Sequence, residues 1–230
     1  FPLRDADAAA QSSLSQRVHS ADDVRSLLEE LEVGLGEMLL FVQHVQKIAL
    51  LEVGDDGALR VFASVALDTT PAITDARRSM AAIARPSASV AAPTVTAPLR
   101  FELPLALTIG GETTRQRWLI VCGACTHDDA ALLASALGGS LPYAAVAAPL
   151  QTAEAVRGRA YCFLPLPIAT GLPLHVNANF ALSSNRRELW SADGDDAGGG
   201  HAAKARWNAL LCEEALPELL VHALEHAAAD

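Results

Sequence analysis

Apolar side chains recur three and four positions apart from residue 24 to residue 42, which predicts a long amphipathic helix near the N-terminus. Ser20 and Asp23 have the spacing of a capping box, so the helix is expected to begin directly after Ser20. The apolar positions that carry this prediction are Val24, Leu27, Leu28, Leu31, Leu35, Met38, Leu39 and Val42.

Two apolar runs on either side of a glycine turn predict a β-hairpin, and the pattern occurs twice. The first turn is Gly54-Asp-Asp-Gly57, between 48–53 and 59–66, and the second is Gly110-Gly111, between 99–109 and 113–122. Further strands are expected at 144–148, 159–164 and 172–182, and further helices at 71–84, 128–137 and 202–227. This order predicts an α/β domain with a mixed sheet.

Charge and hydropathy exclude two classes of partner. The chain has 17 basic and 27 acidic residues among 230, and it contains no basic run. Binding to nucleic acid rests on clustered lysine and arginine, so we expect none. No apolar stretch reaches the length of a membrane span, so we expect no membrane association through a helix.

The cysteines and histidines predict no metal site. Cys122 and Cys125 have the spacing of half a zinc site, but Cys162 and Cys212 are isolated and supply no second pair. The segment His222-Ala-Leu-Glu-His226 fits an inverted zinc-protease pattern, yet only Asp230 follows as a possible acidic ligand. Reduced, buried thiols are expected instead, which favours a cytoplasmic location.

Two adjacent arginines follow the predicted strand 172–182. Arg186 and Arg187 come after Ser183, Ser184 and Asn185. A guanidinium is planar and permanently charged, and it binds phosphate or carboxylate with two parallel hydrogen bonds. The pair is therefore a candidate anion site. The alternative is structural: one arginine pairs with Glu188 or an acidic loop, and the other is solvated.

The predicted strand before the arginines carries two further polar residues. His175 and Asn177 could support the arginines or contact a partner, or His175 could be a packed, hydrogen-bonded strand residue. Ser184 follows on the same segment, which leaves open a free-standing α/β enzyme that uses His175 and Ser184. The sequence around Ser184 lacks the nucleophile-elbow pattern of serine hydrolases.

Residues 158–190 resemble the signature of the sacsin repeat. The resemblance is carried by Gly158-Arg-Ala-Tyr-Cys-Phe-Leu-Pro-Leu-Pro167, Thr170-Gly-Leu-Pro-Leu-His-Val-Asn177 and Phe180-Ala-Leu-Ser-Ser-Asn-Arg-Arg-Glu-Leu-Trp190. Shorter segments agree with it: Phe1–Arg4, 37–42, 47–48, 144–150 and Trp207-Asn-Ala-Leu-Leu211.

The resemblance implies a fold and a domain organisation. Sacsin repeats contain a domain that resembles the middle domain of the 90-kDa heat-shock chaperones, preceded by an ATP-binding domain. Residues 1–4 then correspond to the last strand of that ATP-binding domain, residues 5–19 to a linker, and residues 20–230 to the middle-domain-like α/β domain. The chain would be part of a longer chaperone or co-chaperone.

The resemblance also implies roles for site residues. Phe180–Leu189 aligns with the catalytic loop of the chaperone middle domain and places Arg186 at the arginine that reaches the γ-phosphate of ATP. Arg187 is the rival, and His175, Asn177, Ser184 and Asn185 are supporting residues. ATP and Mg²⁺ would be held by the upstream domain, since this chain has no Walker-type loop and none of the family's nucleotide-pocket motifs.

Activity and partners follow from this assignment. The chain alone is expected to bind no ATP tightly and to hydrolyse none, whereas the longer protein could be an ATPase. Its expected partners are the upstream domain, client proteins and other chaperones. Phe1–Arg4 could also pair with another molecule through its unpaired edge. The alternative is a scaffold repeat that binds proteins without ATP chemistry.

Overall fold

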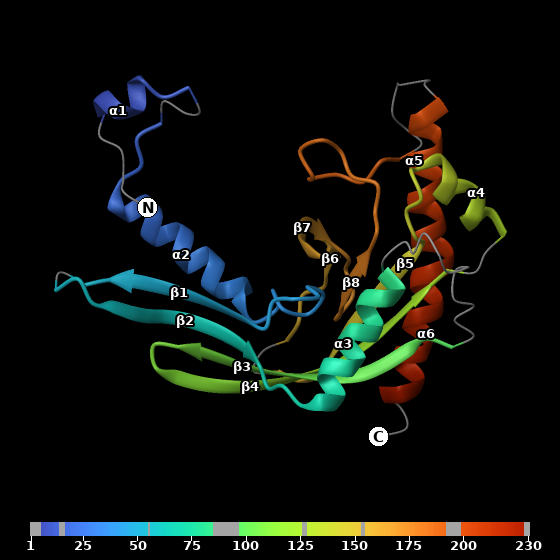
Figure 1. Ribbon diagram of the computed structural model, residues 1–230, viewed down its shortest axis with the longest axis horizontal. Coiled ribbons are helices and arrows are strands. Elements are labelled where there is room, and N and C mark those ends of the chain that lie inside the picture. Colours follow the sequence, from blue (N-terminus) through green and yellow to red (C-terminus); the bar gives the residue numbers. More distant parts are fainter. Residues whose placement is uncertain are drawn as a thin grey trace.

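The computed structural model describes residues 6–13, 17–54, 56–84, 97–125, 128–152, 155–191 and 199–227. These residues form an α/β fold around one eight-stranded mixed sheet, with strand order β1-β2-β3-β4-β5-β8-β6-β7 (Figure 1). Every pair of neighbouring strands is antiparallel except β6 and β8, which are parallel. The strands are β1 (Lys47–Val53), β2 (Leu59–Leu67), β3 (Leu99–Ile109), β4 (Glu112–Ala124), β5 (Tyr143–Gln151), β6 (Arg159–Cys162), β7 (Leu164–Ala169) and β8 (His175–Ala178). The prediction of an α/β domain with a mixed sheet is confirmed.

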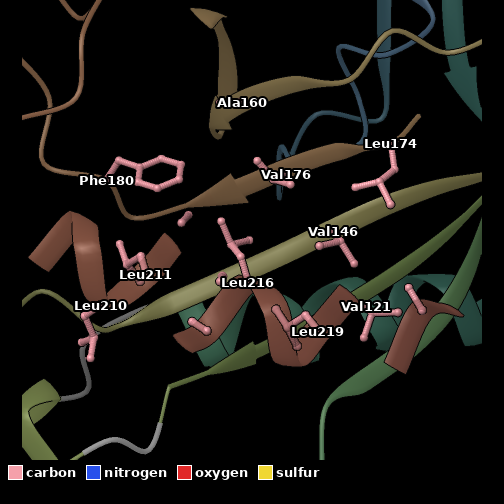
Figure 2. Packing of buried hydrophobic residues seen from close by; sticks show 14 of the residues in the cluster. Val121, Val146, Ala160, Leu174, Val176, Phe180, Leu210, Leu211, Leu216 and Leu219 are labelled. Atoms are coloured by element: carbon pink, nitrogen blue, oxygen red, sulfur yellow. The ribbon is translucent and has the colours of Figure 1, made fainter. Parts of the chain in front are cut away.

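Both faces of the central strands are buried, because side chains alternate between two apolar clusters. On β4, Leu119 and Val121 face one cluster, while Trp118, Ile120 and Cys122 face the other. The first cluster is covered by the C-terminal helices, as Figure 2 shows for Leu210, Leu211, Leu216 and Leu219. The second is covered by α3 (Pro71–Ala84) and by the residues that follow α2 (Ala21–Leu35). The site described below therefore stands on a sheet that is packed on both sides.

The C-terminal helical segment is continuous but changes its winding at a proline. It consists of α5 (Gly199–Leu210), a π-helical turn at Leu211–Ala215 and α6 (Leu216–Ala227). Pro217 has no N–H, and the helical segment continues through it, so one backbone hydrogen bond is missing there. In the π-helical turn before it, the Leu216 amide donates to the carbonyl of Leu211, five residues back. This wider turn gives room to the proline ring, which would clash in a regular helix.

The long N-terminal helix predicted to reach Val42 is not seen. The capping box of Ser20 and Asp23 is present, and α2 begins at Ala21, but it ends at Leu35. Residues 36–45 form turns. Leu39, Leu40 and Phe41 are all buried in the second cluster, so their spacing reflects a buried turn rather than a helix. Gly34 and Gly36 lower helix propensity at this point.

Two predictions for the sacsin-like block are wrong in detail. The strand expected over 172–182 covers only His175–Ala178, and the residues after it form a separate hairpin. The single strand expected at 159–164 is divided between β6 and β7, and β7 continues through Pro165 and Pro167 to Ala169. Because β7 lies at the edge of the sheet, its prolines need donate no ladder hydrogen bond on the outer side.

The N-terminal segment is described only in part. Residues 1–4, predicted to be the last strand of an upstream domain, lie outside the described residues. Within the predicted linker at 5–19, Ala6–Ala10 forms the short helix α1, and Ala9 in it is buried. The remaining helix is α4 (Asp128–Ala136), which ends at Gly138 and Gly139 as predicted.

Among the described residues, no helix is long and apolar enough to cross a membrane.

Candidate functional site

The two candidate arginines lie at the tip of a tight hairpin, which we call the arginine hairpin (residues 182–189). Its two arms meet in an isolated antiparallel bridge between Leu182 and Leu189. The Ser183 amide donates to the carbonyl of Glu188 at 3.0 Å, and the Arg186 amide donates to the carbonyl of Ser183 at 2.9 Å. The arginines are therefore presented by a closed turn and not by the end of a strand.

Side chains within the turn fix its backbone. Asn185 Oδ1 accepts hydrogen bonds from the Arg187 amide at 3.0 Å and from Ser183 Oγ at 2.7 Å, and Ser183 Oγ accepts one from the Glu188 amide at 3.2 Å. Arg186 has a φ of 58°, a left-handed conformation that non-glycine residues rarely adopt. Asn185 thus supports the arginines by shaping the turn, whereas Ser184 is exposed at the tip.

Both guanidiniums are available to an anion. Arg186 and Arg187 are exposed, and Arg186 Nη2 makes one long hydrogen bond of 3.4 Å to the carbonyl of Cys162. No carboxylate of the described residues lies within salt-bridge distance of either arginine. The pairing with Glu188 that the sequence left open is not seen, and the acidic residues of 193–196 lie outside the described residues.

Helix α5 holds the base of the arginine hairpin in place. Asn208, which is buried, accepts from the Ala181 amide at 2.8 Å and donates to the carbonyls of Ala181 at 2.8 Å and Trp190 at 2.9 Å. Trp207 Nε1 donates to the carbonyl of Asn179 at 2.7 Å. Four hydrogen bonds from neighbouring residues of one helix clamp the segments that enter and leave the hairpin.

Trp190 closes the hairpin from the other side. Its indole Nε1 donates to the carbonyl of Leu182 at 2.9 Å, and its ring stacks on His201 with centroids 4.5 Å apart. The ammonium of Lys204 lies 4.8 Å from the same ring centroid, in cation–π contact. These contacts bring a further positive charge to the base of the hairpin and limit the motion of its two arms.

Asn177 and Arg186 meet at the turn between β6 and β7. Asn177 Oδ1 accepts from the Phe163 amide at 2.7 Å, and Phe163 has a φ of 61°. Arg186 contacts the preceding residue, Cys162. Burial raises the pKa of the Cys162 thiol, and the nearby Arg186 opposes that rise. Asn177 therefore supports the arginine indirectly, through the turn on which Arg186 rests.

His175 does not face the arginines. Its ring is fully buried between Trp118 and Tyr161, each with its ring centroid 5.3 Å away. Nδ1 accepts from the Arg159 amide at 3.2 Å, and Nε2 lies 3.3 Å from Glu37 Oε1. This is the packed strand histidine that the sequence offered as an alternative. A buried ring with these partners gives no support to an enzyme that uses His175 and exposed Ser184.

Three residues at the site were not predicted from the sequence. Glu37, Trp207 and Asn208 lie in segments that carried the sacsin resemblance, but their roles depend on distant partners. Asn208 did offer a signal, since it is a polar residue between Trp207 and the apolar Leu210 and Leu211. A polar residue on a buried helix face needs a hydrogen-bonding partner.

The cysteines are not joined by disulfides. Cys122 is buried beside Tyr143, and burial raises the pKa of its thiol to about 12. Within the described residues, no three side chains of His, Cys, Asp or Glu are grouped so that they could hold a metal ion.

The geometry defines a rigid α/β module that presents an exposed pair of arginines. In sequence, the chain is 32% identical to human sacsin over 241 aligned residues. The alignment covers 96% of this chain and 5% of sacsin, so the chain spans about a twentieth of the length of that protein. The chain is thus sacsin-like along nearly its whole length. No protein-family model and no solved structure matches it.

Proposed function

We propose that this chain is the middle segment of a sacsin-like chaperone repeat and that Arg186 contacts the γ-phosphate of ATP held by an upstream domain. The proposal combines the sacsin-like sequence with the geometry of the arginine hairpin. Mg²⁺ would accompany the nucleotide in the upstream domain, and this chain would supply only the guanidinium.

One observation carries the proposal: the two arginines are exposed, have no carboxylate partner among the described residues and sit on a clamped turn. A buried arginine is normally satisfied by its own protein. Here the hairpin instead holds two permanent charges toward solvent, at the cost of a left-handed residue. Such a turn is preorganised for a bulky anion, because little side-chain and loop freedom remains to be lost on binding.

The test is ATP turnover by the longer protein that contains the upstream domain. Replacing Arg186 and Arg187 together by alanine should abolish most turnover and leave nucleotide binding nearly unchanged, because the other domain holds the nucleotide. Arg25→Ala removes an exposed arginine from α2 and is the control for the loss of positive surface charge. Unchanged turnover in the double variant would favour a repeat without ATP chemistry.

A second proposed function, binding of client proteins, is supported by an apolar face on the β1–β2 hairpin. Leu51 pairs with Val61 and Val53 pairs with Leu59, so the four side chains share one face of the hairpin. They are 49%, 54%, 66% and 68% exposed, respectively. Clustered exposed apolar side chains are typical of surfaces that bind other proteins.

The client-binding proposal is tested by replacing Val53 and Leu59 with threonine and serine. The double variant should suppress aggregation of a heat-denatured model protein less well than the unchanged chain. Replacing Leu132 on α4 and Leu224 on α6 in the same way is the control, because both are exposed but lie apart from this face. Equal activity of the two double variants would argue against the hairpin face.

A further inference from the structure

A pocket of about 410 Å³ lies between α3 and the segment that leads into β1. One wall is a face of α3, and the other is formed by residues that follow the buried turn after α2. The pocket shares no residue with the arginine hairpin. Its walls are Gln43, His44, Gln46, Thr69, Ile73, Thr74, Arg77, Arg78, Ala81 and Ala82.

Arg77 is a buried cation at this pocket. Its residue is only 6% exposed. Nη2 donates to the carbonyls of Val42 and, at 3.0 Å, of Val45. The buried Nε has no hydrogen-bond partner, so one of the five N–H donors of the guanidinium is left without an acceptor.

No carboxylate of the described residues pairs with Arg77, although a buried charge normally has a partner of opposite sign. Burial lowers the pKa of Arg77, and no acidic neighbour offsets that effect. Two carbonyl dipoles compensate part of the charge. An anion in the adjoining pocket would compensate the rest.

The other walls of the pocket suit an oxyanion. Arg78 lies at its rim, where it pairs with Asp75 at 2.6 Å while both side chains remain largely exposed. Thr69 carries a hydroxyl, and Gln43 and Gln46 carry amides, all of which can donate hydrogen bonds. The Thr74 hydroxyl already donates to the carbonyl of Thr70 at 3.0 Å. Ile73, Ala81 and Ala82 provide an apolar wall. Few polar groups beside an apolar wall are usual in small-molecule sites.

We propose that this pocket binds a small anionic ligand through a phosphate or carboxylate group, with Arg77 as the central contact. The site is separate from the nucleotide contact proposed for Arg186. Its volume falls within the range of about 300–1,000 Å³ that is common for small-molecule sites, so it can hold a molecule larger than a bare phosphate ion.

The proposal is tested with a protein in which Arg186 and Arg187 are replaced by alanine, because the arginine hairpin could itself bind phosphate. Inorganic phosphate and citrate are titrated at constant ionic strength, with chloride as the reference ion, and amide chemical shifts are followed by NMR. We expect saturable shifts centred on 43–46 and 69–82. Saturable shifts with phosphate alone would identify phosphate as the preferred group, and saturable shifts with citrate alone would identify carboxylate.

Arg78→Ala should weaken this binding by about threefold or more, since a partly exposed charge at the rim is removed. Arg25→Ala is its matched control, because Arg25 also forms an exposed ion pair with a residue three positions away in the sequence, Asp22. Arg77→Met should abolish the binding. If Arg77→Met does not fold, Thr69→Val and Arg78→Ala decide the question.

Absence of saturable shifts for either anion would overturn the proposal. Equal weakening by Arg78→Ala and Arg25→Ala would also overturn it, since the effect would then reflect net charge alone. In that event Arg77 serves only to clamp the carbonyls of Val42 and Val45 to α3.

Discussion

His175 Nε2 lies 3.3 Å from Glu37 Oε1, across the boundary between the N-terminal segment and the sheet. Nε2 nevertheless has no hydrogen-bond partner among the described residues. Nδ1 accepts from the Arg159 amide, which places the proton of the neutral ring on Nε2. The other oxygen of Glu37 accepts a long bond of 3.4 Å from Tyr161. One carboxylate therefore faces two buried polar groups of the sheet.

Glu37→Ala should lower the free energy of unfolding by about 1–3 kcal/mol, because Tyr161 then loses its acceptor and the carboxylate beside His175 is removed. Glu37→Gln should cost less, since the amide keeps one oxygen in place. Denaturant unfolding of the two variants measures the difference. If both variants are as stable as the unchanged chain, water satisfies these groups and Glu37 has no structural role.

The helix α5 clamp gives a second prediction. Asn208→Ala removes three hydrogen bonds to Ala181 and Trp190, so it should cost about 2–4 kcal/mol at roughly 1 kcal/mol for each bond plus the buried groups left unpaired. Asn208→Asp keeps the acceptor for the Ala181 amide but loses both donations. Hydrogen exchange should show faster opening of 181–190 in both variants. Unchanged exchange there would mean that other contacts hold the arginine hairpin.

Sequence reasoning succeeded where local signals decide the structure. The capping box before α2, Pro71 at the start of α3 and the glycine turns of two hairpins are read within a few residues. Sequence reasoning failed where burial in the core, and not a helix, sets the spacing of the apolar residues. Leu39 and Val42 continue the apolar pattern because they pack in or against the core, although the helix has already ended at Leu35.

At the site, too, the local features were predicted from the sequence and the contacts between distant residues were not. Arg186 and Arg187 were singled out from their chemistry, and the bonds of Asn185 lie within the turn itself. The clamp by Asn208 joins residues 27 positions apart, and the approach of Glu37 to His175 joins residues on different elements. Such pairs follow from topology, which local pattern does not contain.

Gly158 gives a third prediction, because the backbone passes too close for a side chain. A β-carbon at this position would lie 2.1 Å from the carbonyl oxygen of Leu174 and 2.3 Å from that of Leu172. Gly158→Ala should therefore cost more than about 3 kcal/mol or prevent folding. Gly200→Ala in α5 is the control: it meets no atom within 4 Å and should stabilise by up to about 1 kcal/mol. Thermal unfolding distinguishes them, and equal midpoints would contradict the close approach.

Stability should fall at high pH because of Cys122. Burial raises the pKa of this thiol from 9.0 to about 12 in the folded chain, so the folded state keeps a proton that the unfolded state loses. The stability that the buried, protonated thiol contributes is fully present below about pH 9 and is lost as the pH rises toward 12. Cys122→Ala should flatten the decline measured by urea unfolding between about pH 9 and pH 12. An unchanged slope would assign the decline to other groups, such as Tyr143, whose pKa burial also raises.

The last prediction separates the two arginines of the hairpin in the longer protein that contains the upstream domain. An alternating strand would point Arg186 and Arg187 to opposite faces, but the hairpin bends between them. Arg186 lies against Cys162, and Arg187 has no hydrogen bond from its guanidinium to the described residues. We expect Arg186→Ala to reduce ATP turnover far more than it weakens ATP binding, because the guanidinium stabilises charge that builds at the γ-phosphate. Such an arginine is worth about a thousandfold or more in phosphoryl transfer.

Two further variants make this result specific. Arg186→Gly removes the same guanidinium but relieves the left-handed backbone, so it should fold with a stability equal to or about 1 kcal/mol above that of Arg186→Ala while turning over ATP equally slowly. Arg186→Lys should rescue poorly, since lysine keeps the charge and loses the planar fork. If Arg187→Ala is the inactive variant and Arg186→Ala turns over ATP normally, the contact belongs to Arg187. If turnover follows stability across all four variants, the hairpin acts on the fold and not on the phosphate.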